Sequence, residues 1–176
     1  MDEVLRRMKR ILIILPLLLF LGSCNPFAPG LDENLDLGSS IVGDATTIDG
    51  VFQNIKYAYT FRDTTIYGQL INSNYVFVYQ DYDRGVEVTW GRDEEMQTTR
   101  GLFQNVQRLD LVWNNIISLS TDSVSQQASV SRNFNLTVTF NPSDIIRIDG
   151  YATLALARTD AQQSWRIVRW RDESNF

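Results

Sequence analysis

The side chains available for catalysis in this chain are restricted. The 176 residues include no histidine and one cysteine, Cys24. Serine–histidine and cysteine–histidine nucleophile systems, histidine general bases and histidine-rich zinc sites are therefore excluded. Any acid–base chemistry has to use Asp, Glu, Tyr, Arg or Lys side chains.

Asp110 is a candidate general base, because it lies within an apolar, alternating segment. If Asp110 pointed inward, a hydroxyl of Tyr57, Tyr59 or Tyr67 could polarise a substrate oxygen beside it. The alternation favours another interpretation, in which the apolar neighbours face inward and Asp110 faces solvent, paired with Arg108 or a neighbouring strand. We therefore assign no catalytic residue.

Residues 81–87, DYDRGVE, are similar to the start of a calcium-binding loop, with Asp81 and Asp83 at suitable spacing. Gly85 comes one position early, and Arg92 stands where a bidentate Glu is needed. We interpret the segment as an acidic turn. We expect no metal site and no cofactor.

Six apolar aromatic residues are candidates for the lining of a ligand pocket. They are Phe52, Tyr59, Phe103, Trp113, Phe134 and Trp165. Side chains of these types also commonly fill a hydrophobic core. Both interpretations stay open at the level of the sequence.

The segment that precedes Cys24 predicts a lipid anchor. A basic patch from Arg6 to Arg10 is followed by an apolar run, residues 11–21, as in a secretory signal. The run is too short to span a bilayer, which takes about 20 apolar residues. Residues 21–24, LGSC, resemble the bacterial lipobox. The resemblance implies cleavage after residue 23 and a diacylglycerol on the Cys24 sulfur.

A lipidated Cys24 implies a location in the bacterial cell envelope. Three acyl chains would anchor the protein stably, whereas one chain holds only marginally. Asn25 rather than Asp follows the cysteine, which favours the outer membrane. Residues 24–43 are predicted to form a flexible linker, and residues 44–176 a single domain.

The charge of the chain argues against nucleic acid as a partner. The net charge of −5 becomes −7 without residues 1–23, because that segment carries two more basic than acidic residues. The remainder holds one lysine, Lys56. Acidic proteins of this kind are repelled by polyanions.

Helical periodicity predicts a first helix from Thr46 to Phe61, with Thr46 as N-cap and Asp49 as a box-like partner. Asp63 is predicted to cap a short second helix that ends near Ile71, followed by a break at 72–74. A third helix is predicted to start near residue 93, where acidic residues suit a helix start.

Period-two alternation predicts a strand at 75–79 and four long strands after Asn105. Gly150 is predicted to mark a bulge or bend. In the last strand, Trp165 and Ile167 should face one way, and Val168 and Trp170 the other. Helices followed by strands predict an α+β fold, with helices on one face of an antiparallel sheet. The outer face of that sheet could form a homodimer.

Three segments resemble the nuclear-transport-factor-2-like (SnoaL-like) superfamily: VFQNIKYAYTFRDTTIYGQLINSNYVFVY, WGRDEEMQTTRGLF and SWRIVRWRDE. The resemblance implies a cone, formed by a curved antiparallel sheet around N-terminal helices. The superfamily includes isomerases, dehydratases, epoxide hydrolases and non-enzymatic adaptors, so the fold implies no particular activity. The histidine-dependent dehydratase type is excluded, and no catalytic residue can be carried over.

These observations favour a lipid-anchored envelope domain that binds a small apolar ligand or a protein partner without catalysing a reaction. The alternatives are an isomerase or hydrolase that uses carboxylate and tyrosine chemistry on a small hydrophobic substrate, and a purely structural dimerisation module.

Overall fold

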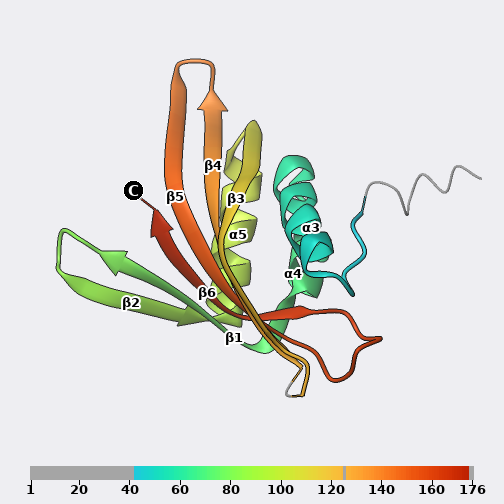
Figure 1. The fold of residues 1–176 in the computed structure, drawn as a ribbon. Coiled ribbons are helices and arrows are strands. Elements are labelled where there is room, and N and C mark those ends of the chain that lie inside the picture. Colours follow the sequence, from blue (N-terminus) through green and yellow to red (C-terminus); the bar gives the residue numbers. More distant parts are fainter. Residues whose placement is uncertain (1–41, 125, 175–176) are drawn as a thin grey trace, which may run out of the picture. The chain divides into compact units, whose positions relative to one another are not determined.

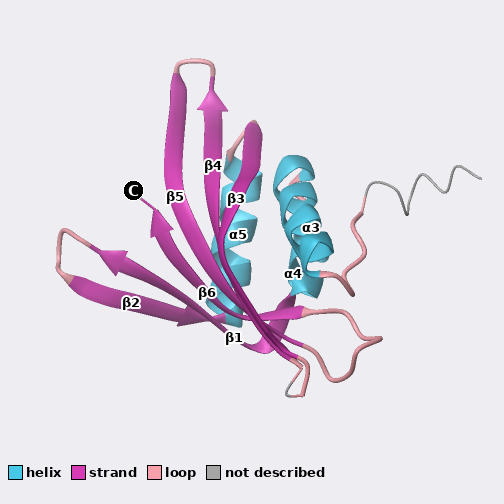
Figure 2. Ribbon diagram, in the orientation of Figure 1, coloured by secondary structure: helices cyan, strands magenta, loops and turns pink. Residues whose placement is uncertain are grey.

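The computed structural model describes residues 42–124 and 126–174, which form three helices and one six-stranded sheet (Figures 1 and 2). The elements in chain order are α3 (Ile48–Phe61), α4 (Thr64–Leu70), β1 (Ile71–Asp81), β2 (Val86–Gly91), α5 (Arg92–Asn105), β3 (Arg108–Asp122), β4 (Gln127–Asn141), β5 (Asp144–Ala157) and β6 (Arg166–Ser174). The sheet is curved, and the helices lie on its concave side (Figure 1). The predicted α+β class is confirmed.

The predicted signal peptide, residues 1–23, lies outside the described residues. So do Cys24 and the predicted linker up to residue 41. Within the part of the chain that the structure describes, no helix has the length and apolar character needed to cross a bilayer.

The strand order of the sheet is β2-β1-β6-β5-β4-β3. Four of its five pairings are antiparallel, but β1 and β6 run parallel. The prediction of a wholly antiparallel sheet is therefore wrong for this one pair. The physical reason is that β1 and β6 are far apart in the chain, so no hairpin turn forces them to run in opposite directions.

The N-terminus of α3 is capped by Thr47, one residue later than predicted. Thr47 Oγ1 accepts a hydrogen bond from the Gly50 N–H at 3.0 Å. The Thr46 N–H instead bonds to Asp44 Oδ1 at 2.9 Å, and Asp49 pairs with Arg132 at 3.7 Å. The cap falls on the residue whose side chain can reach the third N–H of the helix.

The second helix has the predicted cap. Asp63 Oδ1 accepts hydrogen bonds from the backbone N–H groups of Thr65 and Ile66, at 2.8 and 3.0 Å. The predicted break at 72–74 is instead part of β1. It coincides with an irregularity in the β1–β6 register between Ile71 and Val76. Polar residues there interrupt the apolar pattern without ending the strand.

Strand β2 is absent from the sequence-based prediction, although Val86, Val88 and Trp90 alternate with polar residues. The alternation spans only five residues, and β2 is an edge strand in which Val86 is exposed. A short edge strand gives a weak apolar signal because only one neighbour covers it.

Trp170 points into the core, contrary to the predicted alternation of the last strand. Ile167 pairs with Leu156 and Trp170 pairs with Leu154, so the register of β5–β6 shifts by one residue between them. This β-bulge turns Trp170 to the same face as Ile167. Trp170 is 7% exposed and Ile167 is fully buried. The predicted dimer surface around Val168 therefore lacks Trp170.

Gly150 lies within a regular stretch of β5, where it pairs with both Phe134 and Ser174. The predicted bulge or bend at this glycine is wrong. A Cβ here would touch the Ser174 Cα and come within 2.8 Å of the Glu173 carbonyl oxygen. Gly150 thus permits a close approach between the backbones of β5 and β6.

Candidate functional site

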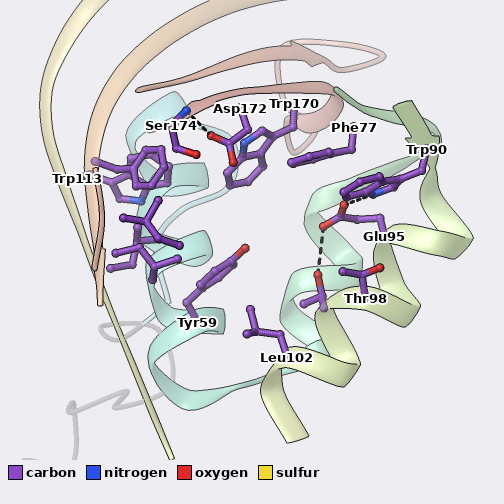
Figure 3. A pocket seen from close by; sticks show the side chains of 15 residues that line it. Tyr59, Phe77, Trp90, Glu95, Thr98, Leu102, Trp113, Trp170, Asp172 and Ser174 are labelled. Carbon is purple, nitrogen blue, oxygen red and sulfur yellow. Dashed lines mark hydrogen bonds between the residues drawn. The ribbon is translucent and has the colours of Figure 1, made fainter. Parts of the chain in front are cut away.

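A cavity of about 320 Å³ lies between α5 and the concave face of the sheet (Figure 3). Its lining comprises Tyr59, Phe77, Trp90, Glu95, Thr98, Thr99, Leu102, Leu111, Trp113, Phe134, Leu136, Ile148, Trp170, Asp172 and Ser174. Thr98 is exposed, so the cavity reaches the surface beside α5. Its volume falls within the range of about 300–1,000 Å³ that is typical of small-molecule sites.

Aromatic rings form much of the cavity wall. Phe77 on β1 and Trp90 on β2 are stacked, with ring centroids 4.4 Å apart and an interplanar angle of 13°. Trp113 on β3 lies 5.9 Å from the Phe134 ring and 6.3 Å from the Trp170 ring. The cross-strand pairings Phe77–Trp90 and Trp113–Phe134 place these rings together. The wall therefore offers flat, polarisable surfaces to a ligand.

Glu95 is a buried carboxylate in the wall that α5 contributes. It is 4% exposed. Its Oε1 accepts hydrogen bonds from the Tyr67 hydroxyl at 2.6 Å and from Thr99 Oγ1 at 3.1 Å. Its Oε2 accepts one from Trp90 Nε1 at 2.7 Å. Three converging donors offset the cost of burying this acid.

Three tyrosine side chains surround Glu95. Burial, together with the neighbouring Glu95 carboxylate, raises the pKa of Tyr59, Tyr67 and Tyr75 above the usual value of 10.0. Their hydroxyl groups therefore remain protonated at physiological pH and can donate hydrogen bonds. Of the three, Tyr59 lines the cavity, where Figure 3 shows its hydroxyl turned toward the interior.

Asp172 is the second carboxylate of the cavity, near the end of β6. Its Oδ1 accepts a hydrogen bond from the Ser174 backbone N–H at 3.0 Å. Burial raises the pKa of Asp172 above its usual value of 3.8, opposed by the bonds from Ser174 and reinforced slightly by the charge of Glu173. No described basic side chain forms a salt bridge with it.

Trp170 brings an unused hydrogen-bond donor to the same wall. Its Nε1 atom is buried, and no described residue accepts a hydrogen bond from it. Trp113, by contrast, donates from Nε1 to the Phe52 carbonyl at 3.0 Å. Most buried polar groups are hydrogen-bonded, so the unpaired Trp170 N–H is an exception, and it is buried within the wall rather than open to the cavity.

The structure brings together three of the six residues predicted to line a pocket. Tyr59, Trp113 and Phe134 line the cavity. Phe52 and Phe103 are buried behind it, with ring centroids 4.8 Å from Trp113 and 5.4 Å from Tyr59, respectively. Ligand binding by these residues stays a prediction.

Trp165, the sixth predicted residue, lies away from this cavity. The Arg158 guanidinium stacks over its ring at 4.2 Å. Trp165 also lines a separate space of about 80 Å³, which is too small for most ligands.

Asp110 does not line the cavity. It forms an ion pair with Arg108 at 2.8 Å, and its side chain is 39% exposed. Tyr57, one of its predicted partners, packs against Phe61 with ring centroids 4.6 Å apart. Asp110 is therefore a solvent-facing residue of β3, as the alternation of apolar and polar residues in this strand predicts.

The acidic segment after β1 forms a turn. Asp81 accepts a hydrogen bond from the Arg84 N–H at 2.9 Å, and its other oxygen lies 3.4 Å from Arg84 Nε. Among the described residues, no three acidic or cysteine side chains are grouped so that they could hold a metal ion.

Sequence reasoning missed the polar residues of the cavity. Glu95 lies in the acidic start predicted for the third helix, and its spacing to Thr99 and Phe103 places all three residues on one helix face. Asp172 follows Trp170 by two residues, so strand alternation places both on one face once the bulge before them is known. The missing strand β2 explains why Trp90 was overlooked.

No protein-family profile and no curated protein matches this sequence. Solved structures do match. A conserved protein from Planctomyces limnophilus is similar with a TM-score of 0.62 and 16% identity, covering 72% of this chain and 92% of that chain. A proposed scytalone dehydratase from Novosphingobium aromaticivorans matches with a TM-score of 0.61 and 15% identity, over 73% and 82% of the two chains.

A proposed dehydratase of the NTF2-like family from Streptomyces avermitilis matches with a TM-score of 0.58 and 14% identity, over 73% of this chain and 93% of that chain. The described domain thus has the NTF2-like (SnoaL-like) cone fold, as the sequence resemblance implied. At such low identity the likeness concerns the fold alone, because unrelated functions share this kind of scaffold.

Proposed function

We propose that this protein is a lipid-anchored envelope domain whose cone cavity binds a small, largely apolar molecule. The observation that carries the proposal is the cavity of about 320 Å³ with its aromatic wall. Transferring an apolar ligand from water to such a wall is favourable by about 25 cal/mol per Å² of buried surface. The few polar side chains of the lining, such as Glu95, Asp172 and Tyr59, would orient the ligand.

Binding can be tested by equilibrium dialysis of naphthalene against the purified protein. Leu136 lines the cavity, so Leu136→Trp should fill it and abolish binding. Leu119→Trp is the matched control, because Leu119 is 52% exposed on β3 and should leave binding unchanged. Circular dichroism establishes that both variants are folded. Equal binding by the two folded variants would refute a ligand site in the cone.

The anchor is supported by the basic patch, the apolar run and the lipobox-like LGSC at residues 21–24. We propose that Cys24 carries the lipid and that Asn25 directs the protein to the outer membrane. In cells fed labelled palmitate, wild-type protein should incorporate the label and fractionate with membranes. Cys24→Ala should do neither, and continued incorporation would contradict the proposal.

A second candidate function is acid–base catalysis, and Asp172 is the observation that favours it. Burial raises the pKa of this carboxyl beside an apolar cavity, where a proton acceptor could serve a small hydrophobic substrate. Asp172 would take a proton from a carbon next to a carbonyl group. Incubating small cyclic ketones in deuterated water tests this. Wild type should accelerate deuterium incorporation and Asp172→Asn should not.

We propose self-association through β3, at the edge of the sheet, as a further possibility for this domain. The exposed apolar residues Val112, Ile116, Ile117 and Leu119 lie on β3, an edge strand. Exposed apolar edge strands commonly pair with another chain. Light scattering across a concentration series should then show a dimer that Ile117→Lys disrupts. A monomer at every concentration would rule it out.

A further inference from the structure

Aromatic side chains from several elements surround the cavity of the cone. Figure 3 shows rings from α3, β1, β2, β3 and β6 around one open space. They belong to Tyr59, Phe77, Trp90, Trp113 and Trp170. The face of an aromatic ring carries negative partial charge and attracts a cation within about 6 Å of the ring centre. A cation in this cavity would therefore meet rings on more than one side.

The charged side chains of the lining are all acidic. Of the described residues that border the cavity, Glu95 and Asp172 are carboxylic acids, and none is Lys or Arg. Burial raises the pKa of Tyr59, and the charges of Glu95 and Asp172 raise it further. Both carboxylates therefore act on a side chain that faces the interior. Such a cavity repels an anion and attracts a cation.

The two carboxylates also have no counter-ion in the described part of the chain. None of the salt bridges there includes Glu95 or Asp172. Buried charges in proteins are usually paired with an opposite charge, because an isolated one is costly. A positively charged ligand would supply that charge, whereas a neutral ligand of the same shape would not.

The strongest polar groups of the wall are already bonded within the protein or enclosed by it. The Asp172 carboxylate takes bonds from both the backbone N–H and the side chain of Ser174. Trp113 Nε1 donates to the Phe52 carbonyl, and Trp170 Nε1 is buried within the wall. A ligand rich in N–H or O–H groups would give up bonds to water without replacing them at these groups. The wall therefore favours a cation that carries no hydrogen-bond donor.

We propose that the cavity binds a quaternary ammonium ion, in which the nitrogen carries four carbon substituents and one of them bears an apolar group. This inference rests on the binding function proposed above and adds the ligand class. An ammonium of the lysine type is strongly hydrated through its N–H donors, and a quaternary ion lacks them. Aromatic cages recognise ions of this kind.

Equilibrium dialysis of three probes against the purified full chain tests the inference. Benzyltrimethylammonium, 2,2-dimethylpropylbenzene and phenylmethanesulfonate have nearly the same shape, but they are cationic, neutral and anionic, respectively. Wild type should bind the cation, and should bind the anion about tenfold more weakly or not at all. Leu136→Trp, which fills the cavity, should abolish binding of the cation. Cation binding that survives this change, or tighter binding of the anion, would overturn the inference.

The dissociation constant of the cation divided by that of its neutral isostere isolates the contribution of charge. Asp172→Asn removes one carboxylate and should raise this ratio about fivefold to tenfold. Glu94→Gln is the matched control, because it removes the same charge from an exposed position on α5 and should leave the ratio unchanged. Phe77→Leu keeps an apolar side chain without a ring and should raise the ratio about twofold to fivefold.

The outcomes separate the two proposals. If neither these probes nor naphthalene binds wild type, the proposed binding function fails. If naphthalene or the neutral isostere binds but the cation does not, the apolar site stands and the quaternary ammonium inference is wrong. An Asp172→Asn ratio equal to that of wild type leads to the same conclusion. Should Asp172→Asn not fold, Phe77→Leu decides, and if the isostere does not bind, the affinities of the cation for the variants are compared directly.

Discussion

At the scale of single residues, Glu95 is the polar centre of the cone. Its carboxylate accepts hydrogen bonds from the side chains of Tyr67, Trp90 and Thr99, which belong to α4, β2 and α5. One acid therefore joins α4 to α5 and to the end of β2, and the Tyr67 bond spans 28 residues of the chain. Because the site is buried, each of these bonds is costly to leave unmade.

Replacing Glu95 by Gln should destabilise the fold by about 1–3 kcal/mol. The Gln side-chain nitrogen can only donate, so it would face one of the donors that now bond to the Glu95 carboxylate. Denaturant unfolding measures this difference. Glu94→Gln is the matched control on the same helix, since Glu94 is exposed and should change stability by less than about 0.5 kcal/mol. Equal effects of the two changes would show that the Glu95 bonds contribute nothing.

Asp172 links stability to pH. Because burial raises the pKa of Asp172 in the folded protein, the native state holds its proton at pH values where the unfolded chain has lost it. The unfolding free energy therefore falls as pH rises from the usual Asp pKa of 3.8 through the raised value. The contribution of the protonated acid is fully present only below that window.

Asp172→Asn should remove this dependence. The variant should melt at a higher temperature than wild type at pH 7, and the difference should vanish near pH 3, where the acid is protonated in both states. Thermal melts across this range measure it. Asp144→Asn is the control, since Asp144 is exposed. A pH-independent difference between Asp172→Asn and wild type would contradict the burial of this carboxylate.

At the scale of elements, the path of β6 is determined by two local departures from regular strand geometry. The bulge between Ile167 and Trp170 turns Trp170 inward, and Gly150 lets the end of β6 approach β5 closely. Trp170, Asp172 and Ser174 then line the cavity from one strand. Small backbone features of β5 and β6 thus position the polar end of the site.

Gly150→Ala should destabilise the domain by about 1–3 kcal/mol, because the added methyl group meets the backbone of Ser174 and the Glu173 carbonyl. Gly101→Ala is the matched control within α5. No atom lies within 4 Å of a Cβ there, and alanine favours a helix, so stability should rise by about 0.5–1 kcal/mol. Chemical denaturation distinguishes the opposite signs, and a neutral Gly150→Ala would contradict the close approach.

At the scale of the whole domain, two buried clusters form the core. The larger one joins α3, α4 and the inner face of the sheet, and the smaller one contains Phe103, Val106, Leu109 and Val138. Tyr59, Leu136 and Ile148 pack against both clusters. Since these residues are shared, neither cluster can open without exposing apolar surface of the other.

The described domain should therefore unfold in a single transition. Far-ultraviolet circular dichroism and tryptophan fluorescence should give superimposable denaturation curves. Leu136→Ala should lower the stability by about 2 kcal/mol and keep one transition, because it weakens both clusters together. Two resolved transitions in wild type would show that the clusters fold independently.

Local patterns in the sequence predicted the elements well. The Asp63 cap, the acidic start of α5 and the alternation of β3 and β4 depend on neighbours within a few residues, and the structure has them. The α+β class followed from the order of these elements, whereas the cone was implied by the resemblance of three segments to the NTF2-like superfamily. Three of the candidate pocket residues, Tyr59, Trp113 and Phe134, also line the cavity.

By itself, the sequence determined the residue types available for chemistry and the Asp63 cap of α4, because these depend on composition and short-range spacing. The lipidation of Cys24 stays a prediction. Only the tertiary structure decided that Glu95 is buried, that Trp170 faces inward and that Asp172 meets the cavity. The physical reason is that these outcomes depend on a one-residue bulge and on contacts between elements distant in the chain. Neither feature leaves a periodic signal in the sequence.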